Sequence, residues 1–370
     1  MKVLQILPEL NSGGVERGTL ELARYLVNQG DDSWVLSNGG HLVSSLEQEG
    51  TTHVSLPVHK KSLQSLRHVP SLRALLEKER FDIVHLRSRL PAWLVFLALR
   101  KIPPQKKPRV VTTVHGLYSV SRYSEVMTKG EKVICVSEAT KNYVLENYPR
   151  VKKERLTVIP RGIEPDDYHH GYRPTQSWIE NFETDFPDTR GKTLVTLPGR
   201  ITRLKGHHEF FEIVSKLPTN FHGLVAGGHD PKKESYYQEL QNSLRSRNLT
   251  DRISFLGHRS DLRDVLAHSH LVYSLSTKPE SFGRTTLEAL SLGTPVVGYD
   301  HGGVGEILAT CFSQGICPLK DTSTAIQLTQ EILTQKKPIK APGQFTLKHM
   351  LDGTYQAYQK LLSEKLPSSP

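Results

Sequence analysis

The sequence of 370 residues has few cysteines and no long apolar segment. Its three cysteines, Cys135, Cys311 and Cys317, are odd in number and lack metal-ligand spacing, which argues against a disulfide framework and suits a reducing cytoplasm. The longest apolar run, Leu90 to Leu99, has about half the length that a membrane span needs. Met1 to Leu7 is apolar, but Pro8 follows, so we expect a first strand there and not a signal peptide.

Several catalytic motifs are also absent. The sequence has neither Gly-x-Ser-x-Gly nor G-x-x-x-x-G-K-[ST], which excludes the α/β-hydrolase and P-loop classes. It has no Asp-x-Asp and no histidine or cysteine cluster with metal spacing, so we predict no metal site. The glycine loop at residues 11–18 lacks G-x-G-x-x-G. Asp31 and Asp32 stand before the second strand, whereas an acidic residue that binds a ribose would stand at its end. A dinucleotide-dependent dehydrogenase is therefore excluded.

The formal net charge of +10 indicates an acidic partner without saying which one. Nucleic acid, anionic lipid and nucleotide substrates all satisfy it. The basic residues lack the interleaved aromatics of a single-strand binder, so no nucleic-acid partner is expected. Basic residues flank the stretch from Leu90 to Leu99, which is either a buried helix or a segment attracted to an anionic membrane face.

The order of apolar patterns predicts an α/β fold with two domains, since short β-branched runs alternate with longer amphipathic ones in two successive series. The predicted strands are Val3–Leu7, Ser33–Leu36, His53–Leu56, Asp82–Leu86, Val110–Val114 and Val133–Val136, then Leu194–Leu197, Gly223–Ala226, Ile253–Leu256, Leu271–Ser274 and Pro295–Gly298. The pattern dissolves over residues 164–192, which we predict to be a linker. The domains are then residues 1–170 and 171–345, and a final helix over about 346–364 is expected to pack back on the first.

Two glutamates eight positions apart, Glu280 and Glu288, are the most informative feature of the chain. Pro279 and Gly283 place the first in a turn, and the helix formers after Gly283 place the second in a helix. Amides at that helix start offer donors to phosphate, and carboxylates accept bonds from sugar hydroxyls. Upstream, Arg200 and Lys205 supply fixed positive charge. Together these residues predict a site for a sugar attached to a diphosphate.

Other candidates follow predicted strands, at the sheet edge where ligands of open α/β sheets bind. His115 is either substrate-facing or held by a structural hydrogen bond, and Ser137 with Glu138 forms a helix N-cap. The loops at Gly13-Gly14, Gly227 and Gly257 either let backbone approach a ligand or are simple turns.

The ordered set of motifs resembles family 4 glycosyltransferases of the GT-B fold (glycosyl transferases group 1), over nearly the whole chain. The motifs are Gly13-Gly14-Val15-Glu16-Arg17, His115-Gly116, Val136-Ser137-Glu138, Ile159-Pro160-Arg161-Gly162-Ile163, Gly199-Arg200 with Lys205-Gly206, Glu280 with Glu288, and Gly293-Thr294-Pro295-Val296-Val297. Arg161 stands where Asn is frequent in the family.

The resemblance implies two Rossmann-like domains facing a central cleft, with acceptor bound by the first and nucleotide sugar by the second. It implies catalytic roles for Arg200, Lys205, Glu280 and His115. The residues implied in donor binding are Gly13, Gly14, Gly199, Gly227, Gly257, His258, Phe282, Gly283, Arg284 and Glu288.

The implied reaction is retaining, metal-independent sugar transfer without a further cofactor. A UDP-sugar is the expected donor, and a glycan or lipid-linked glycan of the cell envelope, as in lipopolysaccharide synthesis, is the expected acceptor. The enzyme is expected in the cytoplasm, with peripheral contact to the inner membrane face. A sugar-nucleotide epimerase of similar architecture and a non-catalytic glycan-binding or partner-binding protein stay open as alternatives.

Overall fold

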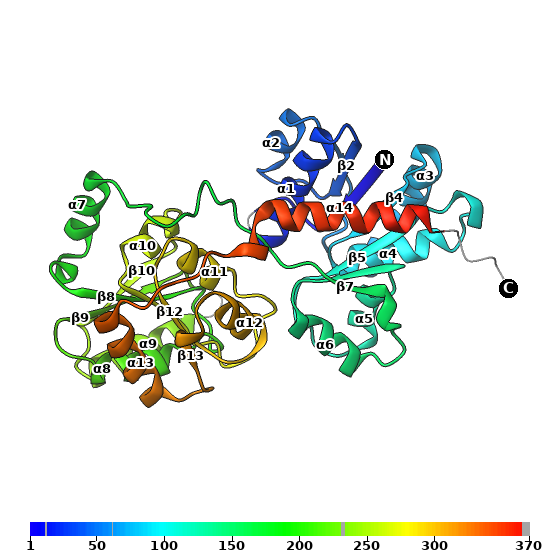
Figure 1. Ribbon diagram of the computed structural model, residues 1–370. Helices are drawn as coiled ribbons and strands as arrows, with labels where there is room; N and C mark the ends of the chain where they lie inside the picture. Colours follow the sequence, from blue (N-terminus) through cyan, green and yellow to red (C-terminus); the bar gives the residue numbers. More distant parts are fainter. Residues whose placement is uncertain (12, 61, 231–233, 365–370) are drawn as a thin grey trace. The chain divides into compact units, whose positions relative to one another are not determined.

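The computed structural model describes residues 1–11, 13–60, 62–230 and 234–364, and the chain divides into two units (Figure 1). The first unit comprises Met1–Pro160 and the segment from Lys348 onward, and the second comprises Arg161–Leu347. Each unit contains one parallel sheet with helices around it, which confirms the predicted α/β class and its two doubly wound domains. The division after Pro160 lies earlier than the boundary at 170 drawn from the sequence.

The sheet of the first unit has seven parallel strands in the order β3-β2-β1-β4-β5-β6-β7. Their bounds are β1 Lys2–Ile6, β2 Asp32–Ser37, β3 Thr52–Ser55, β4 Ile83–Leu86, β5 Arg109–Val114, β6 Lys132–Cys135 and β7 Leu156–Val158. The strand order reverses between β1 and β4, the place in such a sheet where ligands bind at the carboxyl ends of the strands.

Between the strands of this sheet, the chain forms the α-helices α1 to α6 and several 3₁₀ turns. They are α1 Gly14–Asn28, α2 Val43–Gln48, α3 Val69–Glu79, α4 Arg89–Leu99, α5 Arg122–Glu125 and α6 Glu138–Asn147, with η1 Leu63–His68, η2 Pro104–Lys106, η3 Val126–Thr128 and η4 Lys153–Arg155. The segment Leu90 to Leu99 forms most of α4, whose residues Ala92, Leu94 and Val95 are buried in the main core of the unit. In the described part of the chain, no helix has the length and apolar content to cross a membrane.

The last helix, α14 (Leu347–Ser363), lies along the first unit (Figure 1, red). The Tyr358 hydroxyl is 2.5 Å from Nδ1 of His85 on β4, and Tyr25 of α1 donates a 2.8 Å hydrogen bond to Asp352. Because these contacts join α14 to a central strand and to α1, the C-terminal helix is part of the fold of the first unit.

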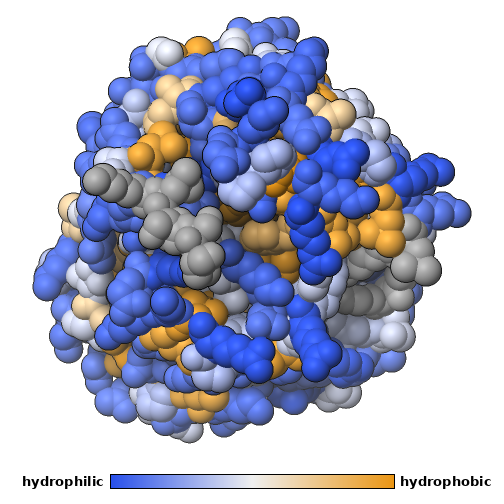
Figure 2. Space-filling view, turned by 90° about the vertical axis from the view of Figure 1, so that its right-hand side faces the viewer, coloured by the Kyte–Doolittle hydropathy of each residue, from blue (hydrophilic) through white to orange (hydrophobic). Residues whose placement is uncertain are grey.

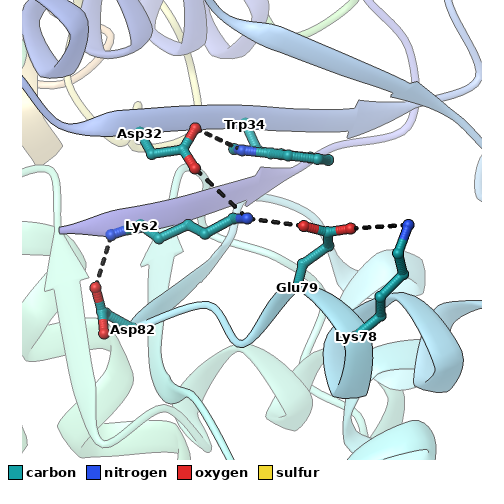
Figure 3. Close-up of polar contacts among 6 residues, drawn as sticks. All are labelled: Lys2, Asp32, Trp34, Lys78, Glu79 and Asp82. Carbon is teal, nitrogen blue, oxygen red and sulfur yellow. Dashed lines mark hydrogen bonds and ion pairs between the residues drawn. The ribbon is translucent and has the colours of Figure 1, made fainter.

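A cluster of charged residues lies at the amino ends of the first strands (Figure 3). The ammonium group of Lys2 is 2.8 Å from Glu79 and 3.5 Å from Asp32, and it stands over the ring of Trp34. The backbone N–H of Lys2 donates to Asp82 at 2.7 Å. This cluster ties β1 to β2 and to the end of α3, at the edge opposite the carboxyl ends of the strands.

The sheet of the second unit has six parallel strands in the order β10-β9-β8-β11-β12-β13. Their bounds are β8 Thr193–Pro198, β9 Phe221–Ala226, β10 Ile253–Gly257, β11 Leu271–Ser274, β12 Val296–Tyr299 and β13 Ile316–Cys317. The helices are α7 Gln176–Asp185, α8 His207–Lys216, α9 Glu234–Ser246, α10 Leu262–His268, α11 Arg284–Ser291, α12 Gly302–Cys311 and α13 Thr322–Gln335, with η5 Pro187–Thr189, η7 Ser313–Gly315 and η8 Gly343–Phe345.

The predicted linker over residues 164–192 contains the helix α7, so its assignment as irregular chain was wrong. Phe182 on this helix is buried with Leu194 and Leu224 of the second sheet, and Trp178 stacks on Phe182 with ring centroids 5.0 Å apart. The interrupting prolines hid a short amphipathic helix that packs on the second unit.

The two chain segments at the border of the second unit run side by side. Ile163 pairs with Thr346 in an isolated parallel bridge, and the N–H of Leu347 donates to the Ile163 carbonyl at 2.7 Å. A Cβ on Gly162 would stand 2.2 Å from the Thr346 carbonyl oxygen, so only glycine permits this close passage. The glycine of the Pro-Arg-Gly motif therefore has a structural reason.

Candidate active site

The centre of the candidate site is an ion pair in the second unit between Lys205 and Glu280. Lys205 lies in the loop between β8 and α8, and Glu280 lies in the loop between β11 and α11. The Lys205 ammonium donates a 2.7 Å hydrogen bond to Glu280 Oε1, and both side chains are about a quarter exposed, at 26% and 27%. The two loops meet because the N–H of Thr277 donates to the Leu204 carbonyl at 2.8 Å. Two predicted site residues are thus in direct contact.

Two further residues, which the sequence did not indicate, hold Glu280 in place. The Ser276 hydroxyl donates to the same Oε1 atom, and the Nε2 atom of His301 lies 2.7 Å from the Ser276 carbonyl oxygen. Burial raises the pKa of Glu280, but the Lys205 ammonium and the bonds donated by Lys205 and Ser276 outweigh it, so the pKa lies below its ordinary value. Glu280 is therefore an ionised acceptor. No motif marks Ser276 or His301; only their place after β11 and β12 could have drawn attention to them.

Glycines bring the strand-end loops together around Lys205. A Cβ on Gly199 would lie 3.1 Å from Cε of Lys205, and a Cβ on Gly227 would lie 2.0 Å from the Gly199 carbonyl oxygen. Gly199 also has a positive φ of 127°. The N–H of Gly199 donates to the Ala226 carbonyl at 2.9 Å. Packing of the loops therefore requires glycine at position 227, and the positive φ favours it at position 199.

The helices that begin around the Lys205–Glu280 pair have no side-chain cap. They are α8, α11 and α12, whose N-cap residues are Gly206, Gly283 and His301. The start of α8 packs on the loop after β11, where a Cβ on Gly206 would meet the Leu275 carbonyl oxygen at 2.2 Å. The starts of α11 and α12 adjoin, since a Cβ on Gly303 would meet Phe282 Cα at 2.4 Å. The N–H of Gly303 donates to the Glu280 carbonyl at 2.8 Å. Uncapped helix starts supply amide donors and positive dipole ends, which suit phosphate oxygens.

Glu280 lies in a loop and Glu288 in α11, as the sequence predicted. Glu288 is only 6% exposed, and its Oε1 atom accepts a 2.9 Å hydrogen bond from Nε of Arg284 one turn earlier. The Phe282 ring is buried and packs edge-on against Phe345, with centroids 5.9 Å apart. Glu288 is therefore a buried carboxylate with one cationic partner.

Three other predicted residues of the second unit are exposed. Arg200 directly follows Gly199, and within the described residues its side chain makes no hydrogen bond or ion pair. Gly257 ends β10 with a positive φ of 66° and open space around its Cβ position, and His258 follows it. A Cβ on Gly228, the neighbour of Gly227, would lie 3.4 Å from the His258 Cβ, so the ends of β9 and β10 adjoin.

The remaining predicted residues belong to the first unit. His115 directly follows β5 and is half-buried, and its backbone N–H donates to the Tyr118 hydroxyl at 3.3 Å. Gly13 is the N-cap of α1, and Gly14 begins that helix with open space around its Cβ position. Ser137 caps α6 by accepting a 3.0 Å bond from the N–H of Thr140, which confirms its predicted capping role. No three histidine, cysteine or acidic side chains of the described chain gather as metal ligands would.

Comparison with known proteins decides the family. Residues 12–167 match the family described as Glycosyltransferase Family 4, and residues 179–346 match that described as Glycosyl transferases group 1. The chain belongs to the group 1 glycosyltransferases. It is therefore an enzyme of the glycosyltransferase class, and the family resemblance drawn from the motifs is confirmed.

Relatives of this group 1 glycosyltransferase include two Escherichia coli proteins. The O-antigen chain mannosyltransferase C is 23% identical over 335 residues, which cover 83% of this chain and 84% of the relative. The UDP-Gal:alpha-D-GlcNAc-diphosphoundecaprenol alpha-1,3-galactosyltransferase is 25% identical over 358 residues, which cover 90% of this chain and 87% of the relative. The crystal structure of a glycosyltransferase from Rickettsia africae superposes with a TM-score of 0.83 at 27% identity, covering 98% of this chain and 99% of that one. The fold is GT-B.

Proposed function

We propose that this group 1 glycosyltransferase moves a sugar from a nucleoside-diphosphate sugar to a hydroxyl of a glycan acceptor, with retention of configuration and without a metal ion. The observation that carries the proposal is the Lys205–Glu280 pair among the uncapped starts of α8, α11 and α12. The cation and the helix amides suit the diphosphate of such a donor, and the ionised carboxylate suits the hydroxyls of its sugar.

Each residue has a distinct part in this proposal. Lys205, together with exposed Arg200, stabilises the negative charge that grows on the departing diphosphate. Glu280 accepts hydrogen bonds from the donor sugar, and Glu288 accepts them from the ribose. When diphosphate binds, its oxygens share the Lys205 ammonium with Glu280. The positive charge thus acts more strongly in the transition state than in the ground state.

Retention follows in this proposal from the leaving group acting as the base. The bond between the anomeric carbon and the phosphate oxygen breaks, and its electron pair stays on the diphosphate. The acceptor oxygen bonds to the same face of that carbon and passes its proton to the diphosphate. No protein nucleophile is needed, and Glu280 is engaged by both Lys205 and Ser276.

The donor is proposed to be a UDP-sugar, the donor class in the printed name of the galactosyltransferase relative. Calorimetry with UDP, GDP, ADP and CMP, followed by the matching sugars, tests the nucleotide. Product anomeric coupling constants in proton NMR test retention, and activity in EDTA equal to that in buffer is expected. A product of inverted configuration would overturn retention, and loss of activity in EDTA would overturn metal independence. Interconversion of a nucleotide sugar in the absence of acceptor would indicate an epimerase. Nucleotide binding without transfer or hydrolysis would indicate a non-catalytic protein.

The acceptor is proposed to be a lipid-linked glycan of the cell envelope, in a pathway such as lipopolysaccharide synthesis, reached from the cytoplasm by peripheral contact with the inner membrane face. Figure 2 shows an apolar area bordered by hydrophilic residues. An open groove of about 540 Å³ lies in the first unit, with apolar lining from Trp93, Phe96 and Leu97 of α4. Basic residues at the groove, Arg100, Lys107 and Lys129, complement anionic headgroups.

Vesicle flotation tests this contact. The full chain is expected to float with phosphatidylglycerol-containing vesicles and not with pure phosphatidylcholine, and the variant Arg100→Gln/Lys107→Gln/Lys129→Gln should lose most of that binding. Lys78→Gln, an exposed charge change in α3, is the control. Equal flotation of the triple variant would overturn the proposed surface.

A further inference from the structure

Arg87 is a buried cation at the ligand-binding edge of the first sheet. It directly follows β4, and its backbone N–H donates to the Ile6 carbonyl of β1 at 3.0 Å. The residue therefore stands between β1 and β4, where the strand order reverses. It is only 4% exposed.

The guanidinium group is held on one side only. Its NH1 group donates a 2.7 Å hydrogen bond to Gln5 Oε1, and the amide of Gln5 donates in turn to the Thr19 carbonyl of α1 at 3.1 Å. The Nε–H of Arg87 is buried and has no acceptor among the described residues. The planar guanidinium group is thus oriented by Gln5, and its Nε–H donor is not satisfied.

No described carboxylate lies within ion-pair distance of Arg87. The groups that oppose the effect of burial on its pKa are Tyr358 of α14 first, and then Glu21 and Glu16 of α1, none of which forms an ion pair with it. Burial lowers the pKa of Arg87 to about 10, and these groups only partly oppose that effect. The residue remains charged at neutral pH, so the first unit buries a positive charge without a counter-ion.

Such an arrangement costs free energy, because a buried charge is normally paired and hydrogen-bonded. The hydrogen bond to Gln5 does not explain why a charged residue is buried here, since a neutral donor would satisfy the Gln5 side-chain carbonyl equally well. An arginine fork does suit the two oxygens of a phosphate or carboxylate. The place of Arg87 at the carboxyl edge is where such an anion would arrive.

We propose that Arg87 binds an oxyanion, a phosphate or carboxylate group carried by the acceptor. The assignment of this oxyanion to the acceptor rests on the proposed glycosyl transfer, whereas oxyanion binding by Arg87 does not depend on turnover. Arg87 is then a specificity residue of the first unit, separate from the diphosphate-binding residues assigned to the second.

Binding of inorganic phosphate to the full chain tests this. In an Arg200→Ala/Lys205→Ala background, which removes the proposed diphosphate cations, phosphate is still expected to raise the thermal midpoint relative to chloride at equal ionic strength. Adding Arg87→Gln should weaken phosphate binding by about tenfold or more. Retained phosphate binding after Arg87→Gln, or no phosphate response in the background chain, would overturn the inference. Either result leaves the donor-site proposal standing.

Two companion variants separate a ligand from a structural part. Arg67→Gln removes an exposed charge in η1 of the same unit and should leave the response intact. Arg87→Lys keeps the charge but not the fork, so a reduced response is expected, and an unchanged affinity would count against the guanidinium as ligand. Galacturonate and glucose 1-phosphate then distinguish carboxylate from phosphate, and galactose, which is neutral, should give no Arg87-dependent effect.

Discussion

At the scale of single residues, Lys205 is the cation that the structure connects most directly to the candidate chemistry. Its ammonium group is 2.7 Å from Glu280 and faces no other described carboxylate within ion-pair distance. We predict that Lys205→Ala lowers kcat by about 10² to 10³, the effect of losing one preorganised group that stabilises a growing negative charge. Steady-state kinetics with the donor found by calorimetry measures it. Lys216→Ala, at the exposed end of α8, serves as control, and near-normal turnover of the Lys205 variant would contradict the assignment.

Glu288 gives a second residue-scale prediction, on binding instead of turnover. Its carboxylate is buried and has Arg284 as its partner. We expect Glu288→Gln to weaken UDP binding by about 10- to 100-fold, the range for losing a charge-assisted hydrogen bond to the ribose. Calorimetric titration with UDP measures the change. Glu331→Gln, on the outside of α13, should bind UDP normally, and an unchanged dissociation constant for Glu288→Gln would refute the ribose role.

The residues of the candidate site divide by what a sequence can reveal. Glu280 and Lys205 could be placed together beforehand because both follow strands of one parallel sheet, and such loops share an edge. Ser276 and His301 could not be assigned, since a hydroxyl and an imidazole become partners only once β11 and β12 lie side by side. Arg87 was hidden for a similar reason, because its burial depends on Gln5 and α1.

At the scale of elements, close packing of helix starts shapes the loop that carries Glu280. Gly303, in the first turn of α12, lies against Phe282, where a Cβ would be 2.4 Å from backbone. We predict that Gly303→Ala destabilises the protein by about 1–3 kcal/mol, as overpacking does, and lowers donor affinity by displacing residues 280–283. Thermal denaturation and UDP titration measure the two effects.

Gly353→Ala on α14 is the matched control for that change. A Cβ there would lie 3.5 Å from Ile159, an ordinary contact, so alanine should be neutral or slightly stabilising through its higher helix propensity. A Gly303 variant with stability and UDP affinity equal to those of Gly353→Ala would show that the start of α12 does not shape the loop.

All eleven strands predicted from the sequence are present, within one or two residues at their ends. Runs of β-branched residues in a fully buried parallel sheet are easily recognised. Two of the four edge strands, β7 and β13, were missed, because three and two residues are too few to form a pattern. The helix α7 was missed because Pro174 and Pro187 flank it closely and its apolar face is short.

At the scale of the whole molecule, each unit has its own parallel sheet and its own hydrophobic core. The first unit is built from chain segments at both ends of the sequence, since α14 packs on β4 and α1. Its sheet begins at the amino terminus, where the charge cluster of Lys2 joins β1, β2 and α3 (Figure 3).

That cluster makes the stability of the first unit depend on pH in a defined window. The hydrogen bond to Glu79 raises the pKa of Lys2 above its ordinary 10.5, and the bond from Lys2 lowers the pKa of Glu79 below its ordinary 4.5. A lowered carboxyl pKa stabilises the folded state above pH 4.5, and this stabilisation is lost as pH falls through the folded value. A raised lysine pKa stabilises the folded state below pH 10.5, and that contribution is lost as pH rises through the folded value.

We therefore predict that Lys2→Met lowers the thermal midpoint at pH 7 by about 1–2 °C, a small effect because the pair is partly exposed. Toward pH 3 the difference from the unmodified chain should shrink, since protonation of Glu79 removes its ion pair with Lys2. It should not vanish, because the ammonium still stands 4.6 Å from the centre of the Trp34 ring. Scanning calorimetry at pH 3, 5 and 7 measures the differences. Lys101→Met, at an exposed position without an ion pair among the described residues, should show no such pH dependence. A Lys2 effect that is constant across the three pH values would mean that packing on Trp34, and not the ion pair, stabilises this edge.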